Sequence, residues 1–218
     1  MEKLLIGVDF SINKPAMTIL YNGEYTFMAW PLSMSQNLVE SYKLVNIDIF
    51  NRGLEEIKKD KMTSSELALT HVTRSLHLAD IIVNYIRNFI LSHNMTDYEI
   101  ILASEGLSFG SFGNAALDLA SYKGVFLAFL YKTFGDRISG LFTYPPISLK
   151  STAGCTCKDK IKDKKAMVHA FINEPVEHPF RTALENGRFL AKKNYMMCVD
   201  DIVDSYFALK TLMTRENV

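Results

Sequence analysis

Three aspartates, Asp200, Asp201 and Asp204, stand within five positions of the segment VDDIVDS, and the chain then continues into an apolar run. Carboxylates this close repel one another, and aspartate is a poor residue for a helix interior. One explanation is that the triplet opens a helix, because acidic side chains in a first turn satisfy free N–H groups and the positive end of the helix dipole. The other explanation is that these carboxylates bind a cation.

Two more carboxylates end apolar segments that have the character of buried strands. The run LLIGVDF reaches Asp9, and the run YEIILASE ends at Glu105. A carboxylate at the end of an apolar strand costs several kcal/mol to bury unless something compensates for it. Each strand could simply reach solvent at that point. Functional groups of α/β sheets gather at strand ends, however, so the two positions also predict a site.

Helical spacing leaves one choice open within the triplet. Asp201 and Asp204 are three residues apart and share a helix face, but Asp200 and Asp204 are four apart and share a face as well. Together with the two strand ends, such a set offers four hard oxygen ligands, which suit Mg²⁺ or Mn²⁺. Two such ions about 3.5–4 Å apart clamp both oxygens of an in-line phosphoryl displacement. Asp9, on the central strand, is the ligand expected to bridge them.

The elements that must position these residues follow from hydrophobic patterning. Asn22-Gly23 joins two β-rich runs after the first strand, which predicts a hairpin. Helical spacing of apolar residues covers 64–92 and continues, after the fourth strand, in a small-residue-rich helix over 112–134. The order predicts an α/β fold with a mixed five-stranded sheet flanked by helices and an enlarged helical segment between the third and fourth strands. We expect a single domain over 1–218, with an insertion at about 31–98.

Composition narrows the class of protein further. The 218 residues are 48% hydrophobic and carry a formal net charge of zero, so overall charge gives no sign of a polyanionic partner. The segment 150–165, with six lysines and two aspartates, is nevertheless a local basic patch. Three cysteines without disulfide spacing favour a reducing compartment, and no apolar run is long enough for a membrane span or signal peptide. We therefore expect a cytoplasmic protein, with no membrane contact.

At this point the residues resemble a known family, the RuvC-type Holliday junction resolvases of the RNase H-like superfamily. The resemblance covers most of the chain and rests on five motifs in the right order. These are GVDFS at 7–11, ILASEGLSFG around Glu105, ASYKGVFLAFL, PPISLKSTAG…KDKKAMV, and DIVDSYFAL in the last helix. The first motif departs from the usual Asp-Pro-Gly of the family.

The resemblance implies a metal-dependent endonuclease that resolves four-way DNA junctions by paired nicks. It implies two Mg²⁺ or Mn²⁺ ions per site and selects Asp201 over Asp200 as a ligand. It also implies that Lys150 and Lys165 are catalytic lysines facing the DNA, and that a homodimer is formed. Further residues expected to contact DNA are Lys158, Lys160, Lys164, Phe109 and Phe112, of which the two phenylalanines could equally pack in the core.

Some features depart from the family and leave alternatives. The segments 31–98 and 174–195 are enlarged, as in phage or viral members, which points to a bacterial or phage-infected host cell. The same site could act on flaps, branched DNA or RNA–DNA hybrids instead of four-way junctions. An actin-like or sugar-kinase-like ATPase is a distant alternative, because GVDFS resembles a phosphate loop, but the sequence contains no second Gly-rich phosphate loop.

The helices at 64–93 and 112–134 carry more apolar residues than one core-facing stripe requires. This excess predicts the dimer surface, because contiguous exposed apolar area usually marks an interaction site. The alternative is that the segment 31–63 covers the extra apolar positions within the same chain.

Overall fold

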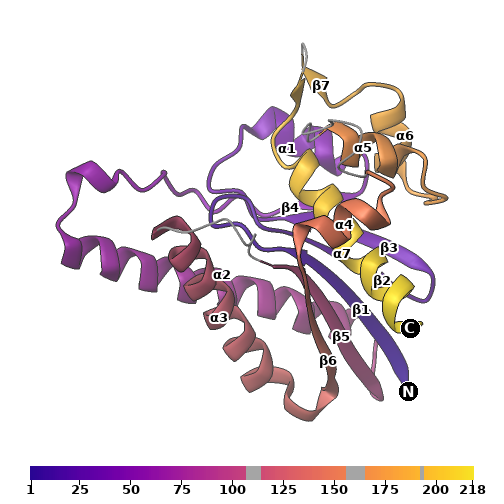
Figure 1. The fold of residues 1–218 in the computed structure, drawn as a ribbon, viewed down its shortest axis with the longest axis horizontal. Helices are drawn as coiled ribbons and strands as arrows, with labels where there is room; N and C mark the ends of the chain where they lie inside the picture. Colours follow the sequence, from indigo (N-terminus) through magenta and orange to yellow (C-terminus); the bar gives the residue numbers. More distant parts are fainter. Residues whose placement is uncertain (107–113, 156–164, 192–193) are drawn as a thin grey trace. The chain divides into compact units, whose positions relative to one another are not determined.

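The structure, a computed structural model, describes residues 1–106, 114–155, 165–191 and 194–218 (Figure 1). Its main sheet has six strands in the order β4-β3-β2-β1-β5-β6. Their bounds are β1 Glu2–Asp9, β2 Ala16–Tyr21, β3 Glu24–Ala29, β4 Ile47–Ile49, β5 Tyr98–Glu105 and β6 Ile138–Tyr144. A separate two-stranded ladder joins β7, Leu190–Ala191, to β8, Asn194–Tyr195.

The sheet is mixed, and the directions of its strands decide at which edge each strand ends. The strands β1, β2 and β3 pair antiparallel, with the predicted Asn22-Gly23 turn between the last two, and β4 joins β3 in parallel. The N–H of Glu2 donates to the carbonyl of Asp97, so β1 and β5 begin together; the N–H of Gly106 donates to the carbonyl of Tyr144, so β5 and β6 end together. Three antiparallel strands followed by two parallel ones make the predicted mixed sheet of an α/β fold, to which β4 adds a sixth strand.

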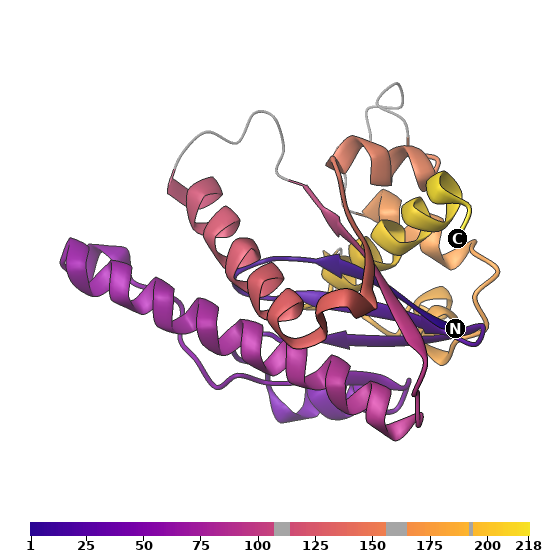
Figure 2. The same ribbon diagram turned by 90° about the horizontal axis from the view of Figure 1, so that it is seen from below.

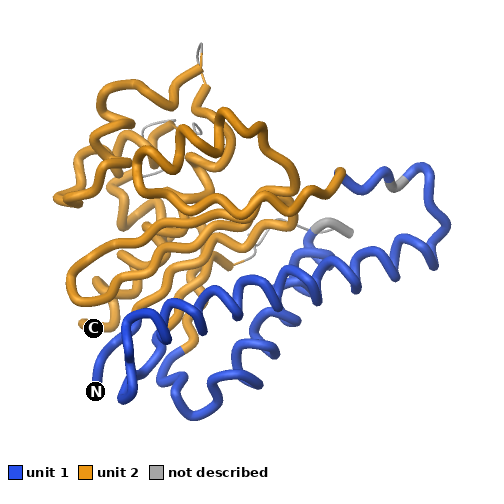
Figure 3. The backbone as a smooth tube through the Cα atoms, turned by 180° about the vertical axis from the view of Figure 1, so that it is seen from behind, with its two compact units in different colours: residues 1–4, 56–101, 107–140 blue, residues 5–55, 102–106, 141–218 orange. Residues whose placement is uncertain are grey.

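The chain divides into two compact units (Figure 3). The first unit comprises residues 1–4, 56–101 and 107–140, and the second comprises 5–55, 102–106 and 141–218. Three strands of the sheet run through both units. The prediction of a single nuclease domain with an insertion at 31–98 is not tested by this division.

The first unit is built on two helices, α2 (Ser64–Ser92) and α3 (Asn114–Phe134), which pack side by side (Figure 2). Thr63 caps α2: its hydroxyl accepts from the N–H of Glu66, whose carboxylate accepts from the N–H of Thr63 in return. Such a reciprocal cap stabilises a helix start. The predicted helix at 64–92 is therefore one continuous helix. Two short 3₁₀ turns, Lys59–Lys61 and Gly135–Arg137, flank this pair in sequence.

The second unit buries its core between the sheet and α7 (Val199–Glu216), which lies across the antiparallel strands in Figure 1. Gly7 of β1 makes this close approach possible, because a Cβ there would lie 2.1 Å from the carbonyl oxygen of Ser205. The Ser205 hydroxyl is hydrogen-bonded to the Thr18 hydroxyl of β2 at 2.7 Å. Phe27 of β3 packs against Phe171 of α5 (Lys165–Ile172) and against Tyr206, which completes the core on this face.

Three helices of the second unit were not predicted. They are α1 (Gln36–Lys43), α4 (Pro146–Thr152) and α6 (Pro179–Glu185). Pro146 and Pro179 are each the first residue of a helix. Proline suits that position, because its missing N–H would have had no partner there and its φ is already helical. Among the described residues, no helix is long and apolar enough to span a membrane.

Candidate metal centre

The edge of the sheet where β1 and β5 end carries Asp9 and Glu105. These strands are adjacent and parallel, so their last residues reach the same edge. Side chains alternate between faces along a strand, so Asp9 shares the face of Gly7, which is the face covered by α7. Both carboxylates belong to the second unit and are partly buried.

The start of α7 supplies the remaining acidic residues. Cys198 precedes the helix with a positive φ of 72°, and the hydroxyl of Tyr42 donates to the neighbouring Met197 carbonyl at 2.5 Å, which fixes this turn. Asp201 is only 7% exposed. Asp204 lies one turn further along and immediately before Ser205, the residue that contacts the sheet. The first explanation of the triplet, an acidic helix start, is therefore correct, and it is compatible with the second.

Electrostatics shows that the predicted carboxylates act on one another. Burial raises the pKa of Asp9 well above its ordinary value, and the negative charges of Asp204, Asp201, Glu105 and Asp200, in that order, raise it further. The structure thus brings all four predicted carboxylates into one electrostatic field. It brings Asp200 there as well, which leaves the choice between Asp200 and Asp201 to their burial.

Asp201 is the more deeply placed of the two. Burial first, and then the charge of Asp200, raise the pKa of Asp201 to about 6, although Lys14 opposes this rise. Its Oδ2 atom is buried and makes no hydrogen bond of good geometry within the described part of the chain. Burying this carboxylate oxygen is costly, and the cation that offsets part of the cost is the Lys14 ammonium, 2.9 Å away. Asp201 therefore fits a ligand role better than the half-buried Asp200.

Lys14 is the residue of the site that the sequence analysis missed. Its Nζ lies 2.9 Å from Asp201 Oδ2 and 3.8 Å from Asp200 Oδ1. Burial lowers the pKa of Lys14, but the charge of Asp201 and the contact with it outweigh burial, so the pKa is raised on balance and the side chain is an ammonium. The signal in the sequence was a lysine five residues after the strand-end Asp9, in the loop that begins at the carboxylate edge.

The donor set fits a divalent metal. Clustered carboxylates that repel one another, and a buried oxygen without a good hydrogen bond, are what a hard cation such as Mg²⁺ or Mn²⁺ would stabilise. The residues that would hold it are Asp9, Glu105, Asp201 and Asp204. Within the described ranges, however, no three His, Cys, Asp or Glu side chains already stand in a coordinating arrangement. The carboxylates are gathered, and final coordination would need side-chain adjustment.

The predicted DNA-contacting residues are placed only in part. Lys150 is exposed in the last turn of α4, and Lys165 is the first residue of α5 and is half-buried. Their roles stay predictions. The remaining residues of this set lie outside the described part of the chain: Lys158, Lys160, Lys164, Phe109 and Phe112.

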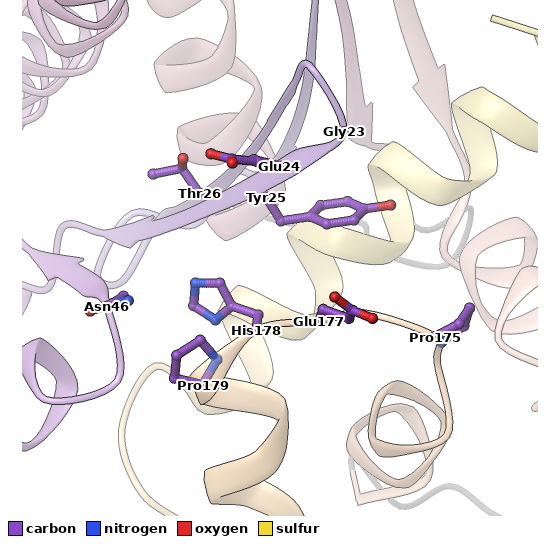
Figure 4. A pocket seen from close by; sticks show the side chains of 9 residues that line it. All are labelled: Gly23, Glu24, Tyr25, Thr26, Asn46, Pro175, Glu177, His178 and Pro179. Atoms are coloured by element: carbon purple, nitrogen blue, oxygen red, sulfur yellow. The ribbon is translucent and has the colours of Figure 1, made fainter.

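A pocket of about 650 Å³ in the second unit offers a different place for a ligand (Figure 4). It lies between the start of β3, with Glu24 and Tyr25, and the segment before α6, with Glu177 and His178. The Nδ1 atom of His178 accepts from the N–H of Phe180 and caps α6, and burial lowers the pKa of this histidine to about 4. Its imidazole is therefore a neutral structural group. None of the clustered carboxylates lines this pocket.

Comparison with known proteins gives likeness of fold only. No protein-family model matches the sequence, and no curated protein matches it. The RuvC structure from Thermus thermophilus aligns with a TM-score of 0.49 and 11% identity, over 98% of this chain and 96% of that one. T. thermophilus RuvC in complex with a Holliday junction substrate aligns at 0.48 and 10%, over 98% and 96%. The yeast mitochondrial Holliday junction resolvase Ydc2 aligns at 0.43 and 14%, over 96% and 77%.

The chain thus aligns with RuvC structures along nearly its whole length. Identities of 10–14% and TM-scores below 0.5 carry no argument about activity. The function has to be argued from the residues of this chain.

Proposed function

We propose that this chain is a metal-dependent DNA endonuclease that resolves four-way junctions by paired nicks. One observation carries the proposal: two strand ends and one helix start together carry five carboxylates, and the charges of the other four add to burial in raising the pKa of Asp9. Structural ion pairs neutralise charge, whereas this cluster accumulates negative charge. Such a cluster is a candidate functional site because perturbed carboxylates gather where a cation or a proton transfer is needed.

Different residues of the chain would have different roles in hydrolysis. Asp9 and Glu105, on adjacent parallel strands, would provide a rigid edge for cation binding, and Asp201 and Asp204 would close the site from α7. Bound Mg²⁺ or Mn²⁺ supplies Lewis acidity, which lowers the pKa of water and offsets charge on the leaving 3′ oxygen. The buried position of Asp201 limits competing water at its carboxylate. Two ions per site and bridging by Asp9 belong to this proposal.

Lysines of the segment 150–165 would hold the DNA, with Lys150 and Lys165 nearest the cleaved bond. Each phosphate that a lysine neutralises on duplex arms should contribute about −0.9 to the slope of log affinity against log salt. We expect Lys150→Ala and Lys165→Ala to make this slope shallower and to slow cleavage. If both leave slope and rate unchanged, the segment is not part of the site.

We propose the four-way junction as the substrate because of the motif resemblance. The two equivalent strands of such a junction favour a two-fold symmetric enzyme. The first unit offers a surface for a second copy. An apolar groove of about 480 Å³ runs between α2 and α3, and its rim includes the exposed side chains of Val72, Leu76 and Leu117. Light scattering that shows only a monomer at micromolar concentration, with unpaired nicks on a cruciform plasmid, would overturn the dimer but leave the nuclease.

A cleavage assay on four substrates tests the function itself. The purified protein is given a four-way junction, a flap, a linear duplex and an RNA–DNA hybrid, each with and without Mg²⁺. We expect Mg²⁺-dependent cuts in the junction, paired across its two-fold axis, and no cuts with Asp9→Asn. Preference for the flap or the hybrid would support an RNase H-like nuclease of another specificity. Cleavage of none of them, or equal cleavage by Asp9→Asn, would contradict the proposal.

A further inference from the structure

We propose that Lys14 is a built-in counter-ion that competes with the divalent metal for Asp201, and so sets how much metal the site requires. The inference rests on the proposed metal centre and deepens it. Lys14 acts through the carboxylates and is therefore a positioning residue.

The contacts of Lys14 show that it occupies the space beside the carboxylates. Its Nζ is 2.9 Å from Asp201 Oδ2 and 3.8 Å from Asp200 Oδ1, so one ammonium bridges both aspartates. The side chain of Asp201 is 9% exposed, whereas that of Lys14 is 32% exposed. The ammonium is thus more accessible to solvent than the carboxylate that it contacts.

The loop that carries Lys14 is fixed, so this contact is not a chance position of a surface side chain. The N–H of Lys14 donates to the Ser11 hydroxyl at 2.9 Å. The guanidinium of Arg52 donates to the carbonyls of Ile12 and Asn13 at 2.7 and 3.0 Å. The N–H of Leu32 also donates to the Asn13 carbonyl, at 2.9 Å. These bonds hold the backbone up to Lys14, so its side chain can move without moving the loop.

Competition follows from the shared oxygen. A Mg²⁺ ion would have to approach Asp201 to about 2.0–2.1 Å. An ammonium at 2.9 Å from the same carboxylate oxygen would then face a divalent cation at short range, and like charges this close repel strongly. The flexible four-carbon stem of lysine allows the ammonium to swing away from the cluster. Metal binding therefore includes the cost of separating Lys14 from Asp201.

A purely structural role for Lys14 predicts something different. If the ion pair only holds the loop against α7, its removal would lower stability and leave metal affinity unchanged or weaker. If Lys14 competes, its removal tightens metal binding. The two roles are thus separated by a binding measurement made without DNA and without turnover.

The test is a calorimetric titration of Mn²⁺ into the full-length protein and its variants. Lys14→Met keeps most of the side-chain volume and removes the charge, and Lys14→Arg keeps the charge. Lys3→Met is the matched control, because Lys3 pairs with Glu99 at 4.0 Å away from the carboxylate cluster. We expect Lys14→Met to bind Mn²⁺ at least about fivefold more tightly, the effect of one unit charge at about 4 Å even in water. Lys14→Arg and Lys3→Met should bind like the wild type.

The outcomes distinguish this inference from the metal centre on which it rests. If the wild type and Asp201→Asn bind Mn²⁺ equally or not at all, the proposed metal centre fails and the role of Lys14 fails with it. If the wild type binds, Asp201→Asn does not, and Lys14→Met binds no more tightly than the wild type, the metal centre stands and competition by Lys14 is overturned. Lys14→Gln provides the same comparison if the methionine variant does not fold.

Discussion

Acidic side chains lie along α7 at two places, and the two places differ in how far the negative charge is neutralised. Glu174, whose side chain is 12% exposed, accepts from the Lys210 ammonium at 2.5 Å and from the Tyr206 hydroxyl at 2.9 Å. One carboxylate is thus matched by one cation and one further donor. At the start of the same helix, Asp201 is about as buried, but four other carboxylates surround the site and Lys14 is the cation described beside them.

The difference separates a structural carboxylate from the group that we propose to be functional. The Glu174 group is complete within the chain, so its removal should cost stability and leave activity intact. The group at Asp9 and Asp201 carries more negative charge than Lys14, the cation described beside it, can neutralise. Its removal should cost activity and leave stability intact. Opposite effects of the two substitutions would be stronger evidence than either loss alone, because general misfolding would reduce both activity and stability.

The largest expected effect is on cleavage by Asp201→Asn. Substituting a residue that only hydrogen-bonds to a metal ligand costs about 10–100-fold in affinity or activity, so loss of a direct ligand should reduce the rate by at least about 100-fold. The free energy of unfolding without metal should stay the same or rise, because one repelling charge is gone. Single-turnover cleavage and urea denaturation measure the two quantities. Comparable rates for Asp201→Asn and Glu174→Gln would erase the distinction between the two groups.

The next effect is on stability, through Glu174→Ala. This change leaves the Tyr206 hydroxyl and the Lys210 ammonium without the carboxylate that both contact, which should cost about 1–3 kcal/mol. Because Lys210 is 28% exposed, water will reduce the loss. Glu185→Ala is the control: Glu185 pairs with Arg181 at 3.4 Å but is 54% exposed, and such pairs contribute about 0.3–0.5 kcal/mol. Equal losses in urea denaturation would contradict the distinction.

The smallest expected effect is the dependence of stability on pH. The folded pKa values of Asp9 and Asp201 are raised, to about 6 for Asp201, whereas an unfolded aspartate titrates near 3.9. Between these values the folded state binds more protons, so stability without metal should fall as pH rises from about 4 through 6. We expect a change on the order of 1 kcal/mol, since one pKa unit corresponds to about 1.4 kcal/mol. Stability that rises over this range, or falls equally in Asp9→Asn, would contradict the raised values.

The parts of the fold that could be predicted from sequence are those that depend on patterns of neighbouring residues. The strands ending at Asp9 and Glu105 are continuous apolar runs, and α2 has a clear helical period with a capping box at Thr63. The starts of α4 and α6 were missed, because sequence alone does not distinguish a proline at the first position of a helix from a proline that ends an element.

The positions of the candidate carboxylates could be predicted, because strand ends and an acidic helix start are local features; their role as metal ligands stays a prediction. Lys14 could not be predicted, since its partner Asp201 lies 187 residues away and only the antiparallel course of α7 across β1 brings them together. Burial, which separates Asp201 from Asp200, likewise depends on tertiary packing.

The most direct test of the metal centre is a crystal structure of the protein grown with Mn²⁺ and recorded where manganese scatters anomalously. The account predicts anomalous density bounded by oxygens of Asp9, Glu105, Asp201 and Asp204, with one or two peaks. In the same structure, the Lys14 ammonium should have moved away from Asp201. Density at another place, or none beside these carboxylates at millimolar Mn²⁺, would contradict the account.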